Sequence, residues 1–444
     1  MAMQKRDMGN CAPEPKKVTH MKRQILKTLV VTALLGVAAG AQTIKDTAHS
    51  AADENRHWVG TWATAPHQPD LGVPGLANQG FENQTVRQIM HLSIGGHEVR
   101  VRLSAFGSNG LVVGAARVAL REAGAGAAIL PESDRVLTFG GSPVISIPPG
   151  ALVLSDPVKL DVPAFADLAI SIYTPGASGP ATWHFESRQL SYVSTPGNFT
   201  ASANMPVLES MPAWFWLAGV DVASDGGAVA AFGGSIADGT QSTLDANHRW
   251  PDYLARRLNA APGKHSSGVL NLGVAGSRVL HDALGSNGLA RFDRDVLAHS
   301  GVTDVIVDQG GNDIFAVDHP SEVVTVEQVI QALRQLIARA HAAGLRIYGC
   351  TTIPEEGFMI PGTSLPVFTA ANERKRQALN AWIRTSGEYD AVIDFDMVLR
   401  DPSHPSRLSP TFDSGDHGHP TDAGYEALAD AVALKLLQTA RDDH

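Results

Sequence analysis

The sequence predicts two domains: an all-β, sandwich-like domain followed by an α/β domain with a parallel sheet. Two observations predict this arrangement. Over residues 57–222, apolar and polar side chains alternate with a period of two, and Pro and Gly break the pattern about every eight to twelve residues. Over residues 223–444, short apolar runs alternate with amphipathic segments of helical period, which is typical of a parallel sheet flanked by helices.

Residues 1–41 read as an N-terminal extension and signal peptide. From Met21, a basic stretch precedes an apolar run over 28–41, which ends in the small-x-small sequence Ala-Gly-Ala of a signal-peptidase site. We therefore expect translation to start at Met21, cleavage before Gln42, and a secreted or periplasmic protein with no stable membrane span after cleavage. An uncleaved anchor helix is the alternative. Residues 42–56 are small and polar and are expected to form a flexible lead-in.

The β half shows its strands by alternation. In "HEVRVRLSAFG" (97–107), Val99, Val101 and Leu103 alternate with arginines, and "FADLAISIYTPG" (165–176) repeats this pattern. Further short strands are expected within 109–120, 134–141, 143–162 and 181–193.

The α/β half shows its strands as continuous apolar runs, because both faces of such a sheet are covered by helices. Strands are expected at 226–234, 268–276, 302–311, 345–354 and 390–399. Helices are expected at 247–260, 288–300, 325–344, 371–387 and 420–439. Ligand sites in parallel sheets of this kind lie at the carboxyl ends of the strands.

Charge and cysteine content exclude several function classes. The 444-residue chain has a net charge of −10, and beyond the N-terminus its basic residues are scattered, which argues against nucleic acid or anionic membranes as partners. Cys11 falls in the extension, and Cys350 lies in an apolar run where a small buried side chain is expected. No Cys/His pairing has zinc spacing, so no metal site is expected.

Four short stretches fall at strand ends or in loops of the α/β half. They are "GGSIADG" (233–239), "NLGVAG" (271–276), "GGNDI" (310–314) and "DHGHP" (416–420). Each alone is weak, since a serine between glycines is usually only part of a turn and an Asn-Asp pair is usually a helix cap. Taken together, they contain the groups that acyl transfer requires.

Acyl transfer needs an activated nucleophile and an oxyanion site. A serine hydroxyl becomes nucleophilic when an imidazole accepts its proton and a carboxylate orients that imidazole. We expect Ser235, His419 and Asp416 to fill these three roles, because Asp416 and His419 lie three residues apart on one loop. The N–H groups of Ser235 and Gly276 and the side-chain amide of Asn312 are the candidate oxyanion donors.

These stretches resemble the four blocks of the SGNH hydrolases, also called GDSL esterases and lipases. The Ser, Gly, Asn and D-x-x-H of those blocks are matched by Ser235, Gly276, Asn312, and Asp416 with His419. The resemblance implies an SGNH-type three-layer α/β/α domain over about 225–440. It also implies a cofactor-independent serine esterase that acts on small-molecule or carbohydrate esters, with short-chain acyl or acetyl esters preferred because no broad apolar lid segment is evident.

The β half is similar to the leading domain of a secreted bacterial branch of these esterases. The resemblance is carried by "HWVGTWATAP" (57–66), "TVRQIMHLSIGGHEVRVRLS" (85–104) and "FWLAGVDV" (215–222).

One position departs from the family. The first block is usually Gly-Asp-Ser, and here it is Gly233-Gly234-Ser235. The missing aspartate is not the triad acid, but in the family it supports the nucleophile turn. Gly234 is expected to loosen that turn unless another acid, such as Asp238 or Asp313, compensates. The alternative function is therefore a catalytically weakened binding protein on an SGNH scaffold.

Other site types fit less well. The G-x-S-x-G elbow of α/β-hydrolases fails at Ala237, and neither glycine-rich phosphate-binding pattern is present. Asp413, Asp416, His417 and His419 are all metal-ligand types, but no second cluster accompanies them.

Tryptophans are frequent in the β half and could form a carbohydrate-stacking platform. Packing is the expected role for these residues, which are Trp58, Trp62, Trp183, Trp214 and Trp216.

Overall fold

The computed structural model describes residues 57–69, 80–124, 126–260 and 266–437. The predicted extension and signal peptide (1–41) and lead-in (42–56) lie outside the described residues. The β half and the α/β half fall within one compact unit that begins at Ala52. No helix in the described ranges has both the length and the apolar character needed to cross a membrane.

Two antiparallel sheets form the β half, as predicted. One has the order β1-β15-β3-β8, with β9 also paired to β3, and the other has the order β13-β12-β2-β10-β5-β6. Apolar residues from both sheets fill one core, including the predicted inward residues Val99, Val101 and Leu103 of β3. The bounds are β1 (Trp58–Ala63), β2 (Gln84–His91), β3 (Gly96–Ser104), β5 (Ala115–Leu120), β6 (Arg135–Val136), β8 (Leu152–Leu154), β9 (Val158–Val162), β10 (Asp167–Thr174), β12 (Ser191–Ser194), β13 (Val207–Met211) and β15 (Leu217–Ala223).

Smaller elements complete this half. They are the pair β4 (Leu111–Val113) and β7 (Ile145–Ile147), the pair β11 (Trp183–His184) and β14 (Trp214–Phe215), and a 3₁₀ turn at Pro131–Ser133.

The α/β half is built on a parallel sheet with the order β17-β16-β18-β19-β20. Its strands are β16 (Gly227–Gly233), β17 (Ser267–Asn271), β18 (Val302–Asp308), β19 (Arg346–Cys350) and β20 (Ala391–Ile393). Of the strands in this sheet, β16 comes first in the sequence but lies between β17 and β18, which come second and third. In doubly wound sheets, ligands bind where the strand order reverses in this way, so the carboxyl ends of β16 and β18 mark the expected site.

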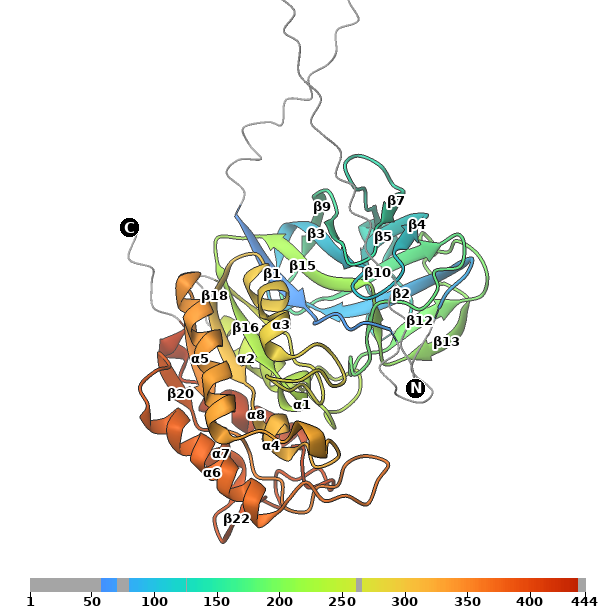
Figure 1. Cartoon of the computed structure of the whole chain (residues 1–444). Helices are drawn as coiled ribbons and strands as arrows, with labels where there is room; N and C mark the ends of the chain where they lie inside the picture. Colours follow the sequence, from blue (N-terminus) through green and yellow to red (C-terminus); the bar gives the residue numbers. More distant parts are fainter. Residues whose placement is uncertain (1–56, 70–79, 125, 261–265, 438–444) are drawn as a thin grey trace, which may run out of the picture. The chain divides into compact units, whose positions relative to one another are not determined.

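Helices cover both faces of this sheet and make it three-layered (Figure 1). Alternate residues of β18 show this, because Val305 and Val307 join a core with α5 and α6, whereas Ile306 joins a core with α2, α7 and α8. The bounds are α1 (Ser235–Asp238), α2 (Trp250–Asn259), α3 (Gly288–Phe292), α4 (Gly311–Phe315), α5 (Val326–Ala342), α6 (Ala370–Thr385), α7 (Phe395–Leu399) and α8 (Asp422–Ala431). A π-helical turn at Asp293–Leu297, 3₁₀ turns at Pro320–Glu322 and Leu434–Leu436, and the pair β21 (Arg400–Asp401) and β22 (His404–Leu408) complete the chain.

Several predicted elements are wrong in extent. The strand expected over 268–276 ends at Asn271, whose side chain accepts the Gly273 N–H. The strand expected over 390–399 ends at Ile393, because the Asp394 side chain accepts the Met397 N–H and caps α7. The helix expected over 420–439 ends at Ala431, where Arg257 donates to the Val432 carbonyl at 3.0 Å.

The helix expected over 288–300 changes into the π-helical turn at Asp293. In this wider turn the buried Asp295 carboxylate pairs with Arg291 and Arg294.

Tryptophans of the β half are packing residues. Trp62, Trp183, Trp214 and Trp216 are buried in the core that continues into the α/β half, and the Arg100 guanidinium lies 4.5 Å from the Trp58 ring. The four buried rings therefore offer no exposed stacking surface, whereas Trp58 is partly exposed.

Candidate active site

Ser235 lies at the sharp turn between β16 and the short helix α1, and its side chain is partly exposed. The turn requires a glycine at position 233, because a Cβ there would lie 2.6 Å from the Ala237 Cβ. The Gly234 N–H donates to the Asp308 carbonyl of β18 at 3.2 Å, which ties the turn to the neighbouring strand. The serine therefore projects from the carboxyl end of β16, beside the point where the strand order reverses.

His419 and Asp416 come from the loop before α8. The His419 Nε2 lies 2.9 Å from the Ser235 Oγ, and its Nδ1 lies 2.7 Å from the Asp416 Oδ2. A carboxylate accepts a hydrogen bond, so Nδ1 carries the proton and the Nε2 lone pair faces the serine hydroxyl. This tautomer is the one in which an imidazole can take a proton from serine.

The Asp416 carboxylate is held in place by its own loop. Its Oδ1 accepts the N–H groups of Gly418 at 2.9 Å and His419 at 2.8 Å. Although burial alone would raise the pKa of Asp416, the hydrogen bond and charge of His419 and these backbone donors hold it well below the usual range. Asp416 is therefore ionised at neutral pH, where its negative charge can balance a positive charge on the His419 imidazole.

The three candidate oxyanion donors lie at neighbouring strand ends. Gly276 has a φ of 71°, in the left-handed region that favours glycine. Among the described residues, no acceptor engages the N–H of Ser235 or of Gly276. The Asn312 Nδ2 donates to the Ser277 carbonyl at 3.0 Å, which leaves its second hydrogen available.

Two acidic side chains brace the loop that follows β17, beside the turn where the sequence has Gly234 in place of the expected aspartate. The Asp238 Oδ2 accepts the Ala275 N–H at 2.9 Å, directly before Gly276. Asp313 accepts the N–H groups of Val279 and Leu280 at 2.7 and 3.0 Å. Both acids named as possible substitutes therefore bind the loop that follows β17.

Arg291 is a further brace that the sequence did not reveal. Its buried guanidinium donates to the Gly233 carbonyl at 2.9 Å and to the Leu272 carbonyl at 2.8 Å, which joins the ends of β16 and β17.

The four metal-ligand types in the same loop separate into two pairs. Asp413 binds the exposed His417 at 2.6 Å, whereas Asp416 binds His419. No group of three or more His, Cys, Asp or Glu side chains in the described ranges is arranged to hold a metal ion.

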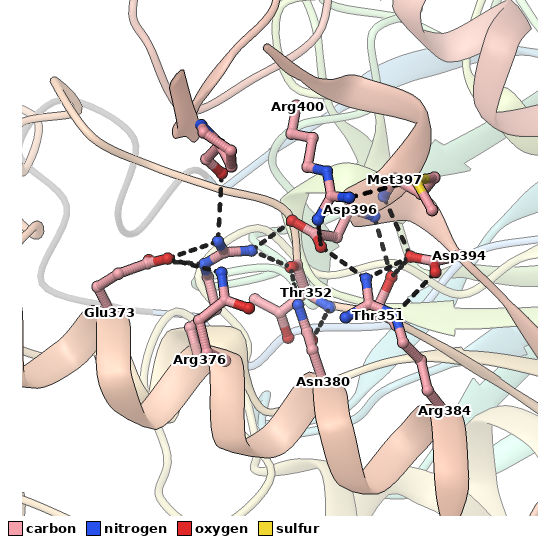
Figure 2. Close-up of polar contacts among 12 residues, drawn as sticks. Thr351, Thr352, Glu373, Arg376, Asn380, Arg384, Asp394, Asp396, Met397 and Arg400 are labelled. Carbon is pink, nitrogen blue, oxygen red and sulfur yellow. Dashed lines mark hydrogen bonds and ion pairs between the residues drawn. The ribbon is translucent and has the colours of Figure 1, made fainter. Parts of the chain in front are cut away.

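A buried ionic network secures the loop after β19. Figure 2 shows Arg376 of α6 between Thr352 and Asp396. The Arg376 Nη1 donates to the Thr352 carbonyl at 3.0 Å and to the Asp396 carboxylate at 2.6 Å. The same loop continues to Phe358, whose ring meets the His419 ring edge-on at 5.2 Å. The network thus anchors a segment that packs against the candidate base, and no sequence motif pointed to it.

Two carboxyls near the site have raised pKa values. Burial raises the pKa of Asp308 to about 7. Burial, followed by the charges of Asp416 and Asp308, raises the pKa of Glu355 to about 8, although Arg376 opposes this. Cys350 is buried, as expected, and burial raises the pKa of its thiol.

Comparison with known proteins assigns the α/β half to a family. The GDSL-like lipase/acylhydrolase family matches residues 231–427, which include all five candidate site residues. No curated protein matches the chain significantly.

Several solved structures are similar to about half of this chain. A carbohydrate acetylesterase from Sinorhizobium meliloti is 17% identical over 48% of this chain and 98% of its own, with a TM-score of 0.37. The M. smegmatis aryl esterase is likewise 17% identical over 48% of this chain and 98% of its own, with a TM-score of 0.37. A GDSL-like lipase from Bacteroides thetaiotaomicron is 18% identical over 47% of this chain and 86% of its own, with a TM-score of 0.34.

The family match runs from the last three residues of β16 through the other four strands of the parallel sheet into α8. Residues 231–427 are therefore a GDSL-like lipase/acylhydrolase domain, and the chain that carries them is a carboxylic ester hydrolase of this type.

Proposed function

We propose that this esterase hydrolyses short-chain acyl or acetyl esters, including those on carbohydrates, through a Ser235–His419–Asp416 triad and an acyl-enzyme. The observation that carries the proposal is the line of contacts from Ser235 Oγ to His419 Nε2 at 2.9 Å and from His419 Nδ1 to Asp416 at 2.7 Å. The absence of a broad apolar lid segment from the sequence favours a short acyl group.

The chemistry follows from these contacts. The Ser235 oxygen forms a bond to the ester carbonyl carbon while its proton moves to His419 Nε2. The negative charge on the former carbonyl oxygen is stabilised by the N–H groups of Ser235 and Gly276 and by the Asn312 amide. The carbon–alkoxide bond then breaks, and the alcohol leaves with the proton from His419. A water molecule, deprotonated by the same nitrogen, hydrolyses the acyl-enzyme.

We also propose that the protein is exported through the segment that begins at Met21. The basic stretch, the apolar run and the Ala-Gly-Ala site in the sequence support this.

The activity is tested by hydrolysis of p-nitrophenyl acetate by the chain from Gln42 onward, with Ser235→Ala as the matched variant. We expect turnover by the native protein and a loss of roughly 10⁴-fold or more in kcat for Ser235→Ala. Equal inactivity of both proteins would instead favour the binding protein on this scaffold.

A further inference from the structure

His184 of the β half is buried and reaches the α/β half. The residue is 2% exposed and lies on β11, with its ring 4.8 Å from the His67 ring and 5.7 Å from the Trp214 ring. Its Nε2 lies 2.9 Å from the Oδ1 of Asp238, the last residue of α1. The side chain thus contacts the short helix that begins with the candidate nucleophile.

The partners of His184 require a proton on both ring nitrogens. Its Nδ1 lies 3.0 Å from the Ala65 carbonyl oxygen, which can only accept, so Nδ1 donates. Its Nε2 faces a carboxylate oxygen and must donate as well. Burial alone would lower the pKa of His184, but the charge and hydrogen bond of Asp238 raise it above its ordinary value. His184 and Asp238 therefore form a buried imidazolium–carboxylate pair.

The second carboxylate oxygen of Asp238 binds the loop over residues 272–280 that follows β17, which we call the oxyanion loop. Its Oδ2 accepts the Ala275 N–H at 2.9 Å, one residue before Gly276. Packing here is close, because a Cβ at Gly273 would lie 2.2 Å from the Asp238 backbone nitrogen. With Oδ1 bound to His184, Oδ2 faces the loop and accepts from it.

We propose that His184 is a positioning residue for ester hydrolysis, which holds Asp238 so that the Ala275–Gly276 backbone presents its N–H to the oxyanion. The leading β half is then part of the catalytic apparatus and not a separate binding module. This inference rests on the proposed function of Gly276 as an oxyanion donor.

The polarity of the pair supports a role beyond stability. A buried ion pair is often no more stabilising than apolar side chains of similar volume, because both charges lose their hydration. An apolar pair at these positions would leave the Ala275 N–H without an acceptor. What the charged pair adds is therefore a fixed acceptor at the loop.

The test compares Asp238→Ala, Asp238→Asn and His184→Phe in the full chain, with His91→Phe as a control. His91 pairs with Asp167 at 2.8 Å within the β half, and among the described residues no hydrogen bond joins its side chain to residues 272–280. Two readouts are measured: kcat and KM for p-nitrophenyl acetate per titrated active site, and hydrogen–deuterium exchange of the peptide over 272–280. The exchange readout does not depend on activity.

We expect Asp238→Ala and His184→Phe to lower kcat by roughly 10–100-fold and to change KM by no more than about threefold. A displaced N–H donor keeps only part of its stabilisation of the transition state. Exchange in 272–280 should accelerate in both. Asp238→Asn should keep most of the activity, since its amide oxygen can accept from Ala275 while its N–H donates to a neutral imidazole. His91→Phe should change neither readout.

An unchanged kcat, or unchanged exchange in 272–280, in a folded Asp238→Ala variant would overturn the inference. If His184→Phe does not fold, the contrast between Asp238→Ala and Asp238→Asn decides, because a His184 that has lost its carboxylate partner can release its proton and remain buried as a neutral ring. Faster exchange combined with an inert native protein would overturn the proposed function while supporting the coupling of His184 to the loop.

Discussion

Gly234 is the position where this chain departs from the family, and a side chain there should impair the enzyme. A Cβ on Gly234 would lie 3.0 Å from the Asn312 Nδ2. Ordinary contact requires a few tenths of an ångström more, so the Asn312 amide must shift, although it is held by the Ser277 carbonyl at 3.0 Å. The amide that moves is the one that we propose as an oxyanion donor.

The size of the effect follows from the value of such a donor. Loss of one oxyanion donor costs about 10²–10³ in kcat, and a partial displacement should cost about tenfold, or ~1.4 kcal/mol. We therefore expect Gly234→Ala to lower kcat about tenfold, with KM little changed. Gly234→Asp should lower it at least as much, because Asp238, Asp313 and Arg291 already brace the adjoining backbone.

The assay is steady-state hydrolysis of p-nitrophenyl acetate. Gly176→Ala is the matched control, since a Cβ at that exposed glycine would meet nothing within 4 Å. A gain in kcat for Gly234→Asp would refute the reasoning, because it would mean that the turn still lacks the support of the missing aspartate.

Three further outcomes are expected. Asp416→Asn should lower kcat by about 10²–10⁴-fold without unfolding the chain, because the imidazole loses its orienting carboxylate. Asp413→Asn in the same loop should leave kcat unchanged, and steady-state kinetics of both variants check this. Arg376→Met should lower the free energy of unfolding by about 2–5 kcal/mol in urea titrations, since Thr352 and Asp396 lose a buried partner, whereas exposed Arg374→Met should change it little. Glu355 has a pKa of about 8 in the folded chain against an ordinary 4.5, so the folded chain holds a proton that the unfolded chain releases, and stability falls as pH rises through this window. Glu355→Gln should therefore match the native protein at pH 5 and exceed its stability at pH 9 by roughly 1–3 kcal/mol in thermal unfolding, and an equal gain at both pH values would contradict this.

The parallel sheet and the candidate site residues were accessible from sequence because their signals are local. The run "GAVAAFGG" has apolar side chains on both faces, and the five site residues lie in short stretches at strand ends or in loops. The structure brings Ser235, Asp416 and His419 into hydrogen-bonding contact, although they come from distant parts of the chain.

The remaining features depend on contacts that no local pattern encodes. His184 meets Asp238 across 54 residues, and its sequence context reads only as a short strand. Likewise, the alternation in "DAVIDFDMVL" indicates a strand, yet the Asp394 cap starts a helix within it. Side-chain capping and buried ion pairs decided these cases, and both require knowledge of the folded neighbours.

The central claim is that Ser235 is the nucleophile, and covalent trapping tests it most directly. The native protein and Ser235→Ala would be incubated with diethyl p-nitrophenyl phosphate, digested and analysed by mass spectrometry. We expect one diethylphosphoryl group on the Ser235 hydroxyl of the native protein, in step with the loss of esterase activity, and none on the variant. Inactivation with the group on another residue, or esterase activity that persists in Ser235→Ala, would contradict the account.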